Sequence, residues 1–191
     1  MKADPNNYHF EPLGHHDRAA FSCGHKELDD YIRNQASQDF KRNLAAVFVM
    51  VRNDDARRVI GYYTLSPRHV QLEQLPEEIA KKAGKYNTVG VTLLGRMAVD
   101  SSQQGQGIGE LVLLEALKQS LLSTERVASF AVFVEAKDEQ AARFYRKYGF
   151  IELAEDKRKL FLPMKTIAKL RLKWLRSSAL PFAPPPSPVL P

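Results

Sequence analysis

The hydrophobic pattern of the chain changes most sharply between Leu93 and Leu122. An apolar strand over 91–99 is followed by the polar corner Asp100–Ser102 and by a turn with three glycines within five residues. After the turn, leucines recur at the 3.6-residue spacing of a helix that covers a sheet, with polar residues on the opposite side. This stretch predicts a strand, a glycine-rich loop and a helix in direct succession.

Upstream of this stretch the pattern predicts an antiparallel hairpin and two helices. Apolar runs bounded by turn residues indicate strands, and the turn Asn53–Asp55 joins two of them. We expect Ser66-Pro67 to close this hairpin. The expected elements are a strand at Tyr8–Leu13, a helix from Lys26 to Phe40, strands at Leu44–Val51 and Val59–Leu65, and a short helix between Pro76 and Gly84.

Downstream, the pattern predicts a second buried strand and another helix. Phe130–Val134 is a continuous apolar run, typical of a strand that is buried on both faces and pairs in parallel. Asp138 is a good N-cap for a helix that reaches Tyr148 and is ended by Gly149. Two further strands are expected at 150–153 and 160–162. Because a strand, a crossover helix and a parallel strand make a right-handed βαβ unit, the fold class is α/β with a mixed central sheet.

The C-terminal end differs in composition from the rest of the chain. We expect residues 1–163 to form one domain, 164–176 a basic amphipathic helix, and 177–191 a disordered segment, since six of the last eleven residues are prolines. Five basic and no acidic residues follow Pro163, so they supply most of the formal net charge of +6. Residues 1–163 carry only +1, and net charge therefore gives no argument for nucleic-acid binding.

The sequence also indicates the cellular compartment of the protein. No stretch approaches the run of about 20 apolar residues that spans a bilayer, and Met1–Tyr8 lacks the apolar core of a signal peptide. The single cysteine, Cys23, excludes an internal disulfide and fits a reducing compartment. We therefore expect a cytoplasmic protein with no membrane partner.

The glycine-rich loop has the composition of an anion cradle. Glycines let the backbone approach a ligand, and the following helix adds unpaired N–H donors and a partial positive charge. Two familiar phosphate loops do not fit. Gly109 is not followed by Lys and then Ser or Thr, and Glu110 stands where a dinucleotide fingerprint requires glycine. Gln104–Gly109 instead has the form Gln-x-x-Gly-x-Gly, although a tight strand-to-helix turn without a ligand would explain the same residues.

Several segments, in the same order along the chain, resemble motifs of the GNAT acetyltransferases. Gln104–Gly109 is similar to their acetyl-CoA loop, and Phe144–Phe150 is similar to the Phe-Tyr-x-x-x-Gly-Phe signature of their last core helix. Phe21–Ala36 and Leu94–Asp100 resemble the N-terminal helix and the central strand of the TacT-like toxins of type II toxin–antitoxin modules. The resemblance implies the GNAT fold, in which two parallel strands splay apart and admit the pantetheine arm of acetyl-CoA.

The resemblance also implies roles for individual residues. The co-substrate is acetyl-CoA, without a metal. Its pyrophosphate is expected on the loop N–H groups and its pantetheine along the central strand, where a bulge would direct one N–H to the thioester oxygen. Tyr145 is the candidate general acid that protonates the coenzyme A thiolate, although its helical position alone favours a core tyrosine. The expected cofactor-binding residues are Met97, Ala98, Val99, Gln104, Gly105, Gln106, Gly107, Ile108 and Gly109.

By the same resemblance, the chain is expected to be a toxin that acetylates the α-amino group of aminoacyl-tRNA and so blocks translation. A ribbon-helix-helix antitoxin and a second copy of the chain, forming a homodimer, are the implied protein partners. No strong general base stands out, and a good fraction of an ester-linked α-amine, with a pKa below about 7.7, is already neutral at pH 7. The candidate RNA-binding residues are Arg33, Lys41, Arg42 and Arg96.

Other reactive side chains do not form a site in the sequence. The adjacent His15 and His16, together with His25, lack the spacing of a zinc motif and are expected at the solvated surface. Cys23 precedes a helix and lies far in sequence from the glycine-rich loop, so we do not expect it to act as a nucleophile.

Two other functions stay open. A GNAT enzyme that acetylates a small amine or a protein N-terminus would turn over without RNA. A non-enzymatic module, whose loop binds coenzyme A or nothing and whose basic tail contacts nucleic acid or an anionic membrane, would lose its function with the tail. That module would keep its function when Tyr145 is replaced by phenylalanine.

Overall fold

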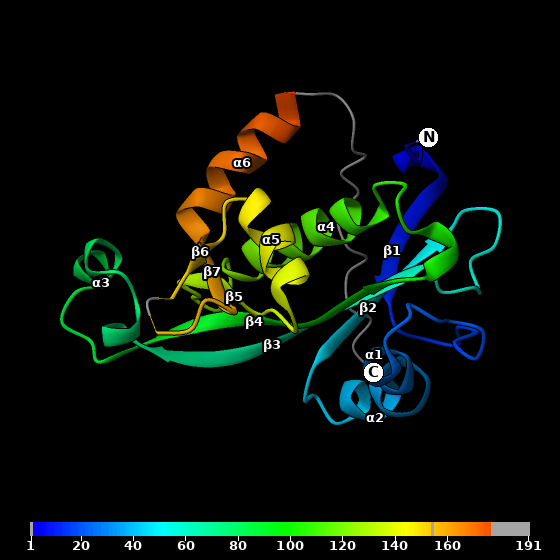
Figure 1. Ribbon diagram of the computed structural model, residues 1–191, viewed down its shortest axis with the longest axis horizontal. Coiled ribbons are helices and arrows are strands. Elements are labelled where there is room, and N and C mark those ends of the chain that lie inside the picture. The colour runs from blue at the N-terminus through cyan, green and yellow to red at the C-terminus, as the bar shows by residue number, and fades with distance from the viewer. Residues whose placement is uncertain (1, 154, 177–191) are drawn as a thin grey trace.

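The computed structural model describes residues 2–153 and 155–176, so the expected proline-rich segment, 177–191, lies outside the described residues. Within them, seven strands form one sheet in the order β1-β2-β3-β4-β5-β7-β6 (Figure 1). Adjacent strands are antiparallel except β4 and β5, which are parallel. The predicted mixed sheet is therefore confirmed. The strands are β1 (Tyr8–Pro12), β2 (Ala46–Arg52), β3 (Gly61–Gln71), β4 (Thr88–Val99), β5 (Ala131–Glu135), β6 (Ile151–Glu152) and β7 (Lys159–Pro163).

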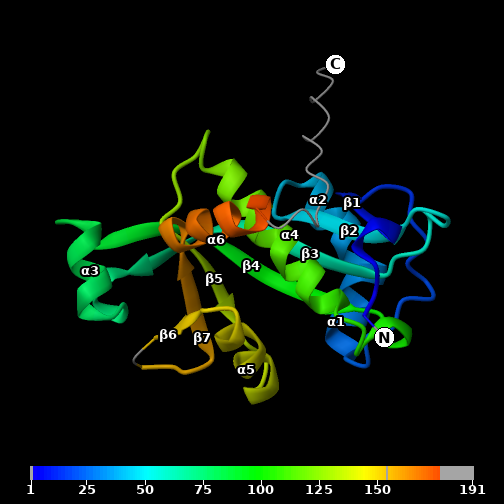
Figure 2. The same ribbon diagram turned by 90° about the horizontal axis from the view of Figure 1, so that it is seen from above.

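Helices cover both faces of this sheet, as Figures 1 and 2 show from two directions. One face carries α4 (Ile108–Ser123), α5 (Glu139–Lys147) and α6 (Met164–Arg176). The other carries one continuous helical segment, made of α1 (Lys26–Asp30), η2 (Tyr31–Gln35) and α2 (Ala36–Lys41). Shorter elements are η1 (Pro5–Asn7), η3 (Leu72–Gln74), α3 (Glu77–Ala83) and η4 (Ser101–Gln103). Within 2–153 and 155–176, no helix is long and apolar enough to span a membrane.

The sheet divides the apolar core. On the α4 face, buried side chains of the central strands pack against α4, α5 and α6. Leu113 and Leu117 of α4 are fully buried, and Met164 and Ile167 of α6 lie in the same core. Because α4 packs against both the sheet and α6, it needs apolar residues on more than one side. On the opposite face, one cluster joins the α1–α2 segment to β2 and β3, and a separate cluster surrounds Phe133.

The two parallel strands separate halfway along β4. β4 and β5 pair only at Thr92 with Val132 and at Leu93 with Phe133. The residues of β4 that follow Leu93 therefore have no ladder partner in β5. This opening confirms the splayed parallel pair that the resemblance implied, and it exposes backbone groups of the second half of β4 to an added ligand.

A bulge in β4 follows this opening. Thr64 of β3 pairs with Arg96, whereas the next residue of β3, Leu65, pairs with Leu94. Gly95 is therefore the extra residue in β4, and a Cβ at this position would lie 3.3 Å from the Thr64 hydroxyl oxygen. A bulge changes the direction of the local backbone groups, and one was expected in this strand.

The hairpin ladder between β2 and β3 ends at Leu65, but β3 itself does not, so the predicted end of this strand was wrong. The strand continues to Gln71, and Pro67 pairs opposite Thr92 of β4. The ladder between β3 and β2 ends at Leu65, so Pro67 lies where β3 has become an edge strand. Proline is tolerated at an edge because the missing N–H disrupts no ladder on the open side.

The helix predicted from Lys26 to Phe40 forms, but its centre is the π-helical turn η2. The N–H of Ala36 donates to the carbonyl of the first η2 residue, five positions back, and so leaves the carbonyl of Ile32 without its usual partner. The Arg18 guanidinium donates to this carbonyl at 3.2 Å. Arg18 therefore satisfies the acceptor that the π-turn releases.

Candidate active site

The turn between β4 and α4 has the geometry of an anion cradle. Gly105 and Gly107 have φ values of 75° and 85°, in the left-handed region that favours glycine. A Cβ on either residue would meet no atom within 4 Å, so this side of the loop is open. In the described part of the chain, no backbone hydrogen bond outside the regular elements uses the N–H groups of Gly105, Gln106 or Gly107. These donors, together with the N-terminus of α4, can bind a phosphate.

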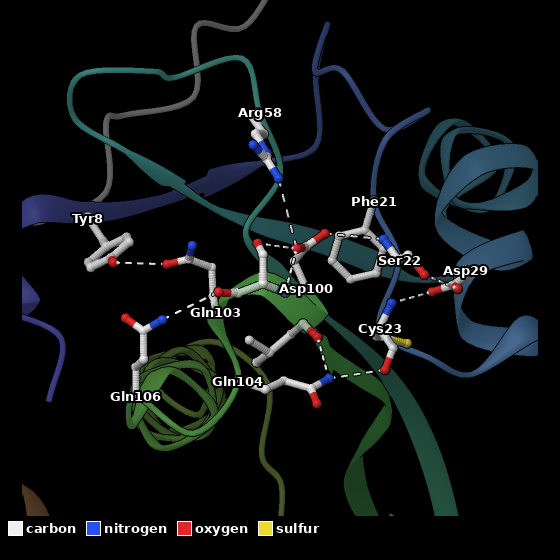
Figure 3. A network of polar contacts seen from close by, with 12 residues as sticks. Tyr8, Phe21, Ser22, Cys23, Asp29, Arg58, Asp100, Gln103, Gln104 and Gln106 are labelled. Atoms are coloured by element: carbon white, nitrogen blue, oxygen red, sulfur yellow. Dashed lines mark hydrogen bonds and ion pairs between the residues drawn. The ribbon is translucent and has the colours of Figure 1, made fainter. Parts of the chain in front are cut away.

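Asp100 anchors the start of this loop (Figure 3). Its side chain is buried, and its carboxylate accepts hydrogen bonds from the backbone N–H groups of Ser102 at 3.0 Å and Ser22 at 3.2 Å. The hydroxyl of Ser102 also donates to it, and the Arg58 guanidinium lies 4.0 Å away. Burial alone would raise the pKa of Asp100, but these hydrogen bonds hold it below its usual value. The ionised carboxylate therefore ties the loop to the segment before α1.

Gln104 makes a second tie between the same segments. Its side-chain amide donates to the carbonyls of Cys23 and Val99, each at 3.0 Å. The contact between Gln104 and Cys23 can be followed in Figure 3. The end of β4 is thus joined to the N-terminal segment by one side chain. The carbonyls of Cys23 and Val99 occupy the side-chain NH2 group of Gln104, and its backbone N–H donates to the Ser101 carbonyl at 3.4 Å.

Sequence reasoning missed this network. Asp100 stood out only as part of a polar corner, although an aspartate two residues before a serine is a signal for an Asx turn. The partner Ser22 lies 78 residues earlier, and no local pattern relates it to the loop. The N-terminus makes a further contact that the sequence did not suggest, because the backbone N–H of Ala3 donates to the Gln106 carbonyl at 2.9 Å.

The predicted cofactor residues follow one continuous path. Met97–Val99 form the end of β4, beyond its pairing with β5. Residues 104–107 form the turn into α4, and Ile108 and Gly109 begin that helix. Met97 and Val99 pack toward the α4 face of the sheet, whereas Ala98 packs toward the α1–α2 face. The backbone of this segment therefore borders the gap between β4 and β5. An extended ligand can add to such an edge through backbone hydrogen bonds.

Tyr145 lies on α5, the helix that follows β5, and is 8% exposed. Its ring packs between Phe144 and Phe150, with centroid distances of 5.4 and 5.3 Å. Burial raises the pKa of Tyr145 well above its usual value, so the hydroxyl keeps its proton at neutral pH. Within 2–153 and 155–176, this hydroxyl has no hydrogen-bond partner. A protonated phenol with a free O–H can act as a general acid.

The four predicted RNA-binding residues have different surroundings. Lys41 and Arg42 lie at the end of α2 and are exposed. Arg33 is half-buried, and its guanidinium donates to the carbonyl of Phe21, so the fold uses part of its hydrogen-bonding capacity. The Arg96 guanidinium on β4 stacks on a tyrosine ring of η2, 3.8 Å from the ring centroid.

Cys23 belongs to the loop-anchoring network. Its backbone N–H donates to the Asp29 carboxylate at 2.7 Å, and its side chain is 5% exposed. Burial, and then the hydrogen bond with Asp29, raises the pKa of the Cys23 thiol to about 11. A thiol with this pKa is a poor nucleophile at neutral pH.

Comparisons with known proteins match this geometry. The acetyltransferase (GNAT) domain family matches residues 43–152. The chain is 27% identical over 169 residues to the probable toxin TacT of Sinorhizobium fredii, an alignment that covers 84% of this chain and 93% of that protein. It is 31% identical over 149 residues to a tRNA-acetylating toxin of Mycobacterium tuberculosis, covering 78% of this chain and 87% of that toxin.

Solved toxin structures share the fold. AtaT complexed with acetyl-methionyl-tRNAfMet has a TM-score of 0.80 and 30% identity, with 86% of this chain and 99% of that one covered. A mutant AtaT bound to the C-terminus of the antitoxin AtaR and to acetyl-CoA has a TM-score of 0.74 and 28% identity, with 86% and 98% covered. The domain match spans more than half of the sequence and includes β4, the glycine-rich loop and α5. The chain therefore belongs to the GNAT acetyltransferase family.

Proposed function

We propose that the protein is a toxin that transfers the acetyl group of acetyl-CoA to the α-amino group of aminoacyl-tRNA and thereby blocks translation. The observation that carries the proposal is the continuous path from the open edge of β4 to the free N–H groups of Gly105–Gly107, which fits an extended ligand with a phosphate at one end. The similarity to the tRNA-acetylating toxin and to AtaT supports the choice of acceptor.

In this proposal, different parts of the site have different roles in acetyl transfer. Bound acetyl-CoA supplies the acetyl group as a thioester. The N–H groups of the loop hold its pyrophosphate, and the backbone of Met97–Val99 holds its pantetheine as an added strand. A backbone N–H at the Gly95 bulge stabilises the oxyanion that develops on the thioester oxygen.

Tyr145 is the proposed source of the proton for the departing thiolate. In water this transfer is uphill, since a thiol has a pKa of about 8.5 and a phenol of about 10. Burial raises the pKa of the Tyr145 phenol, and the same apolar surroundings disfavour a thiolate, so the sulfur atom gains proton affinity as well. The acceptor amine needs no strong base to attack, because a good fraction of an ester-linked α-amine is neutral at physiological pH. The proton that the amine loses as the amide forms restores the Tyr145 phenol, so protons balance over the cycle.

The proposal also assigns partners and a location. A protein antitoxin neutralises the toxin, a partner that the structure of AtaT with the AtaR C-terminus supports. The resemblance to the TacT-like toxins implies that this antitoxin is of the ribbon-helix-helix class. The protein acts as a homodimer in the cytoplasm, where aminoacyl-tRNA is used. Arg33, Lys41, Arg42 and Arg96 are proposed RNA contacts, and of these Lys41 and Arg42 have the most exposed surroundings.

Transfer of labelled acetyl from acetyl-CoA to bulk charged tRNA tests the proposal, with deacylated tRNA and a panel of amines and peptides beside it. We expect label on charged tRNA that is released when the aminoacyl ester is hydrolysed. The released acetyl-amino acid identifies the residue. Label only on small amines or peptides would show an acetyltransferase that does not act on tRNA and would refute the toxin proposal. Label on no acceptor would favour a coenzyme A-binding module.

A further inference from the structure

Arg96 has an unusual environment for an arginine in the middle of a sheet. Its guanidinium carbon lies 3.8 Å from the centroid of the Tyr31 ring, and the residue is half-buried. Within the described part of the chain, its side chain makes no hydrogen bond and no ion pair. Stacking on a ring neutralises neither the charge nor the planar N–H donors of the guanidinium.

Arg68 provides a comparison on the same sheet. Its guanidinium also stacks on a ring, that of Phe133 at 4.8 Å, but it pairs with the Glu135 carboxylate at 2.8 Å. Arg96 also stacks on a ring but, among residues 2–153 and 155–176, pairs with no carboxylate. A half-buried guanidinium that lacks an anion within its own fold is suited to an anion from a ligand.

The Arg96 guanidinium lies close to the proposed site of acetyl transfer. Arg96 directly follows the Gly95 bulge, three residues beyond the last pair of β4 with β5 at Leu93. Tyr31 lies on the α1–α2 face of the sheet, whereas Tyr145 belongs to the α4 core. The guanidinium therefore lies beside the gap that receives the thioester, on the face opposite the proposed general acid.

Tyr31 is packed in the core. It is the first residue of the π-turn η2, it is 3% exposed, and it stacks on Tyr62 with ring centroids 6.1 Å apart. Burial raises the pKa of Tyr31 to about 12, so the ring stays neutral under any practical assay condition. A neutral ring fixed in the core is a stable platform for a cation.

We propose that Arg96 binds one phosphodiester of the acceptor RNA next to the aminoacyl end, and that Tyr31 is the positioning residue that holds its guanidinium in place. This inference rests on the proposed function. Arginine suits the role because its planar N–H groups match two phosphate oxygens. Stacking on Tyr31 fixes the side chain before the RNA arrives, which reduces the entropy lost on binding.

The test measures binding of bulk deacylated tRNA to the full chain over a range of salt concentrations, together with KM values for aminoacyl-tRNA and acetyl-CoA. Arg96→Gln should weaken tRNA binding about tenfold and reduce the slope of log affinity against log salt by roughly 0.7, the value for one phosphate of a single strand. The KM for acetyl-CoA should change less than about twofold.

Tyr31 variants test the positioning role. Tyr31→Phe keeps the ring and should bind tRNA like the wild type, whereas Tyr31→Leu should reproduce the loss seen in Arg96→Gln. The double variant should be no weaker than Arg96→Gln alone, because both changes remove one interaction. If Tyr31→Leu does not fold, fluorinated phenylalanine at position 31 keeps the shape and weakens the face of the ring. Affinity should then fall as fluorine is added.

The inference is overturned if Arg96→Gln leaves both the affinity and the salt slope unchanged. The positioning role is overturned if folded Tyr31→Leu, or the fluorinated ring, binds tRNA like the wild type while Arg96→Gln does not. The proposed function fails separately, if the wild type acetylates no charged tRNA. In that case the binding measurement with deacylated tRNA still decides whether Arg96 contacts a phosphate.

Discussion

The carboxylate of Asp100 accepts a hydrogen bond from the backbone N–H of Ser22 at 3.2 Å, although 78 residues separate the two. Ser101 reinforces this contact, since its backbone N–H donates to the carbonyl of Ser22 at 2.7 Å. The segment before α1 and the loop after β4 are therefore one unit. Because that loop supplies the proposed phosphate donors, its contacts with the segment before α1 help to set the position of those donors.

Replacing Asp100 by asparagine should weaken this unit. The amide has one acceptor oxygen where the carboxylate has two, and its NH2 group faces donors that it cannot satisfy. We expect a loss of about 2 kcal/mol in the free energy of unfolding, seen as a fall in Tm of roughly 4–8 °C. Calorimetric titration of coenzyme A below the Tm should show weaker binding in the folded variant.

The stability that Asp100 contributes should depend on pH. Since hydrogen bonds hold the pKa of Asp100 below its usual value, the ionised carboxylate contributes stability above that usual value, about 3.9. The contribution is lost as the pH falls through the lowered pKa. Asp156→Asn is the matched control, because Asp156 also accepts a backbone N–H, from Arg158 at 3.0 Å, in a loop away from the site. Equal coenzyme A affinity in the wild type and folded Asp100→Asn would contradict the anchoring role.

Gly107→Ala should affect the cofactor loop through backbone strain. At a φ of 85° an L-residue costs about 1–2 kcal/mol, and the new methyl group would project into open space beside the free N–H donors. We expect weaker coenzyme A binding with a small loss of stability. Gly90→Ala in β4 is the control, since its Cβ also meets no atom within 4 Å but its φ is not left-handed. If both variants bind coenzyme A alike, the conformation of Gly107 is not required.

The parts of the fold that local patterns encode were predictable from the sequence. The β4–loop–α4 unit and the α5 helix with its Asp138 cap follow from apolar periodicity, glycine spacing and capping residues. The length of β3 did not follow, because the tolerance of Pro67 depends on where β2 ends. The π-turn and the Asp100–Ser22 bond depend on partners distant in sequence, which a single sequence does not reveal.

Tyr145→Phe should separate chemistry from binding. The change removes one hydroxyl that has no partner within the described residues, so the fold and the affinity for coenzyme A should stay within about twofold of the wild type. Loss of the general acid should lower kcat by about 100-fold or more. Growth arrest on expression should be relieved.

Tyr148→Phe is the matched control for Tyr145→Phe. Tyr148 belongs to the same aromatic group, with its ring 5.0 Å from that of Phe144, but it is partly exposed at the end of α5. It should keep most of the activity. Equal kcat values for the two variants would remove Tyr145 from the mechanism.

The thiol of Cys23 should react slowly with a disulfide reagent in the native protein. Burial and the contact with Asp29 raise its pKa to about 11, so the reactive thiolate is rare below that pH, and the side chain is 5% exposed. The rate should increase sharply in denaturant and as the pH approaches 11. A Val127→Cys variant supplies a control thiol at a position that is 72% exposed. Equal rates at the two cysteines would show that the N-terminal segment opens readily.

Neutralising Lys41 and Arg42 together should weaken tRNA binding in a salt-dependent way. Both side chains are exposed at the end of α2, and within the described residues neither has an ion-pair partner. If each contacts one phosphate, replacing both by alanine reduces the slope of log affinity against log salt by about 1.5. Affinity for coenzyme A should not change.

The control for this double variant removes the same charge elsewhere. Arg126 and Lys157 are exposed in loops after α4 and after β6, and their replacement by alanine lowers the net charge equally. A matching loss of tRNA affinity in both double variants would mean that overall charge, and not the end of α2, controls binding. A loss confined to Lys41 and Arg42 would place the RNA on the α1–α2 face of the sheet, the same face as Arg96.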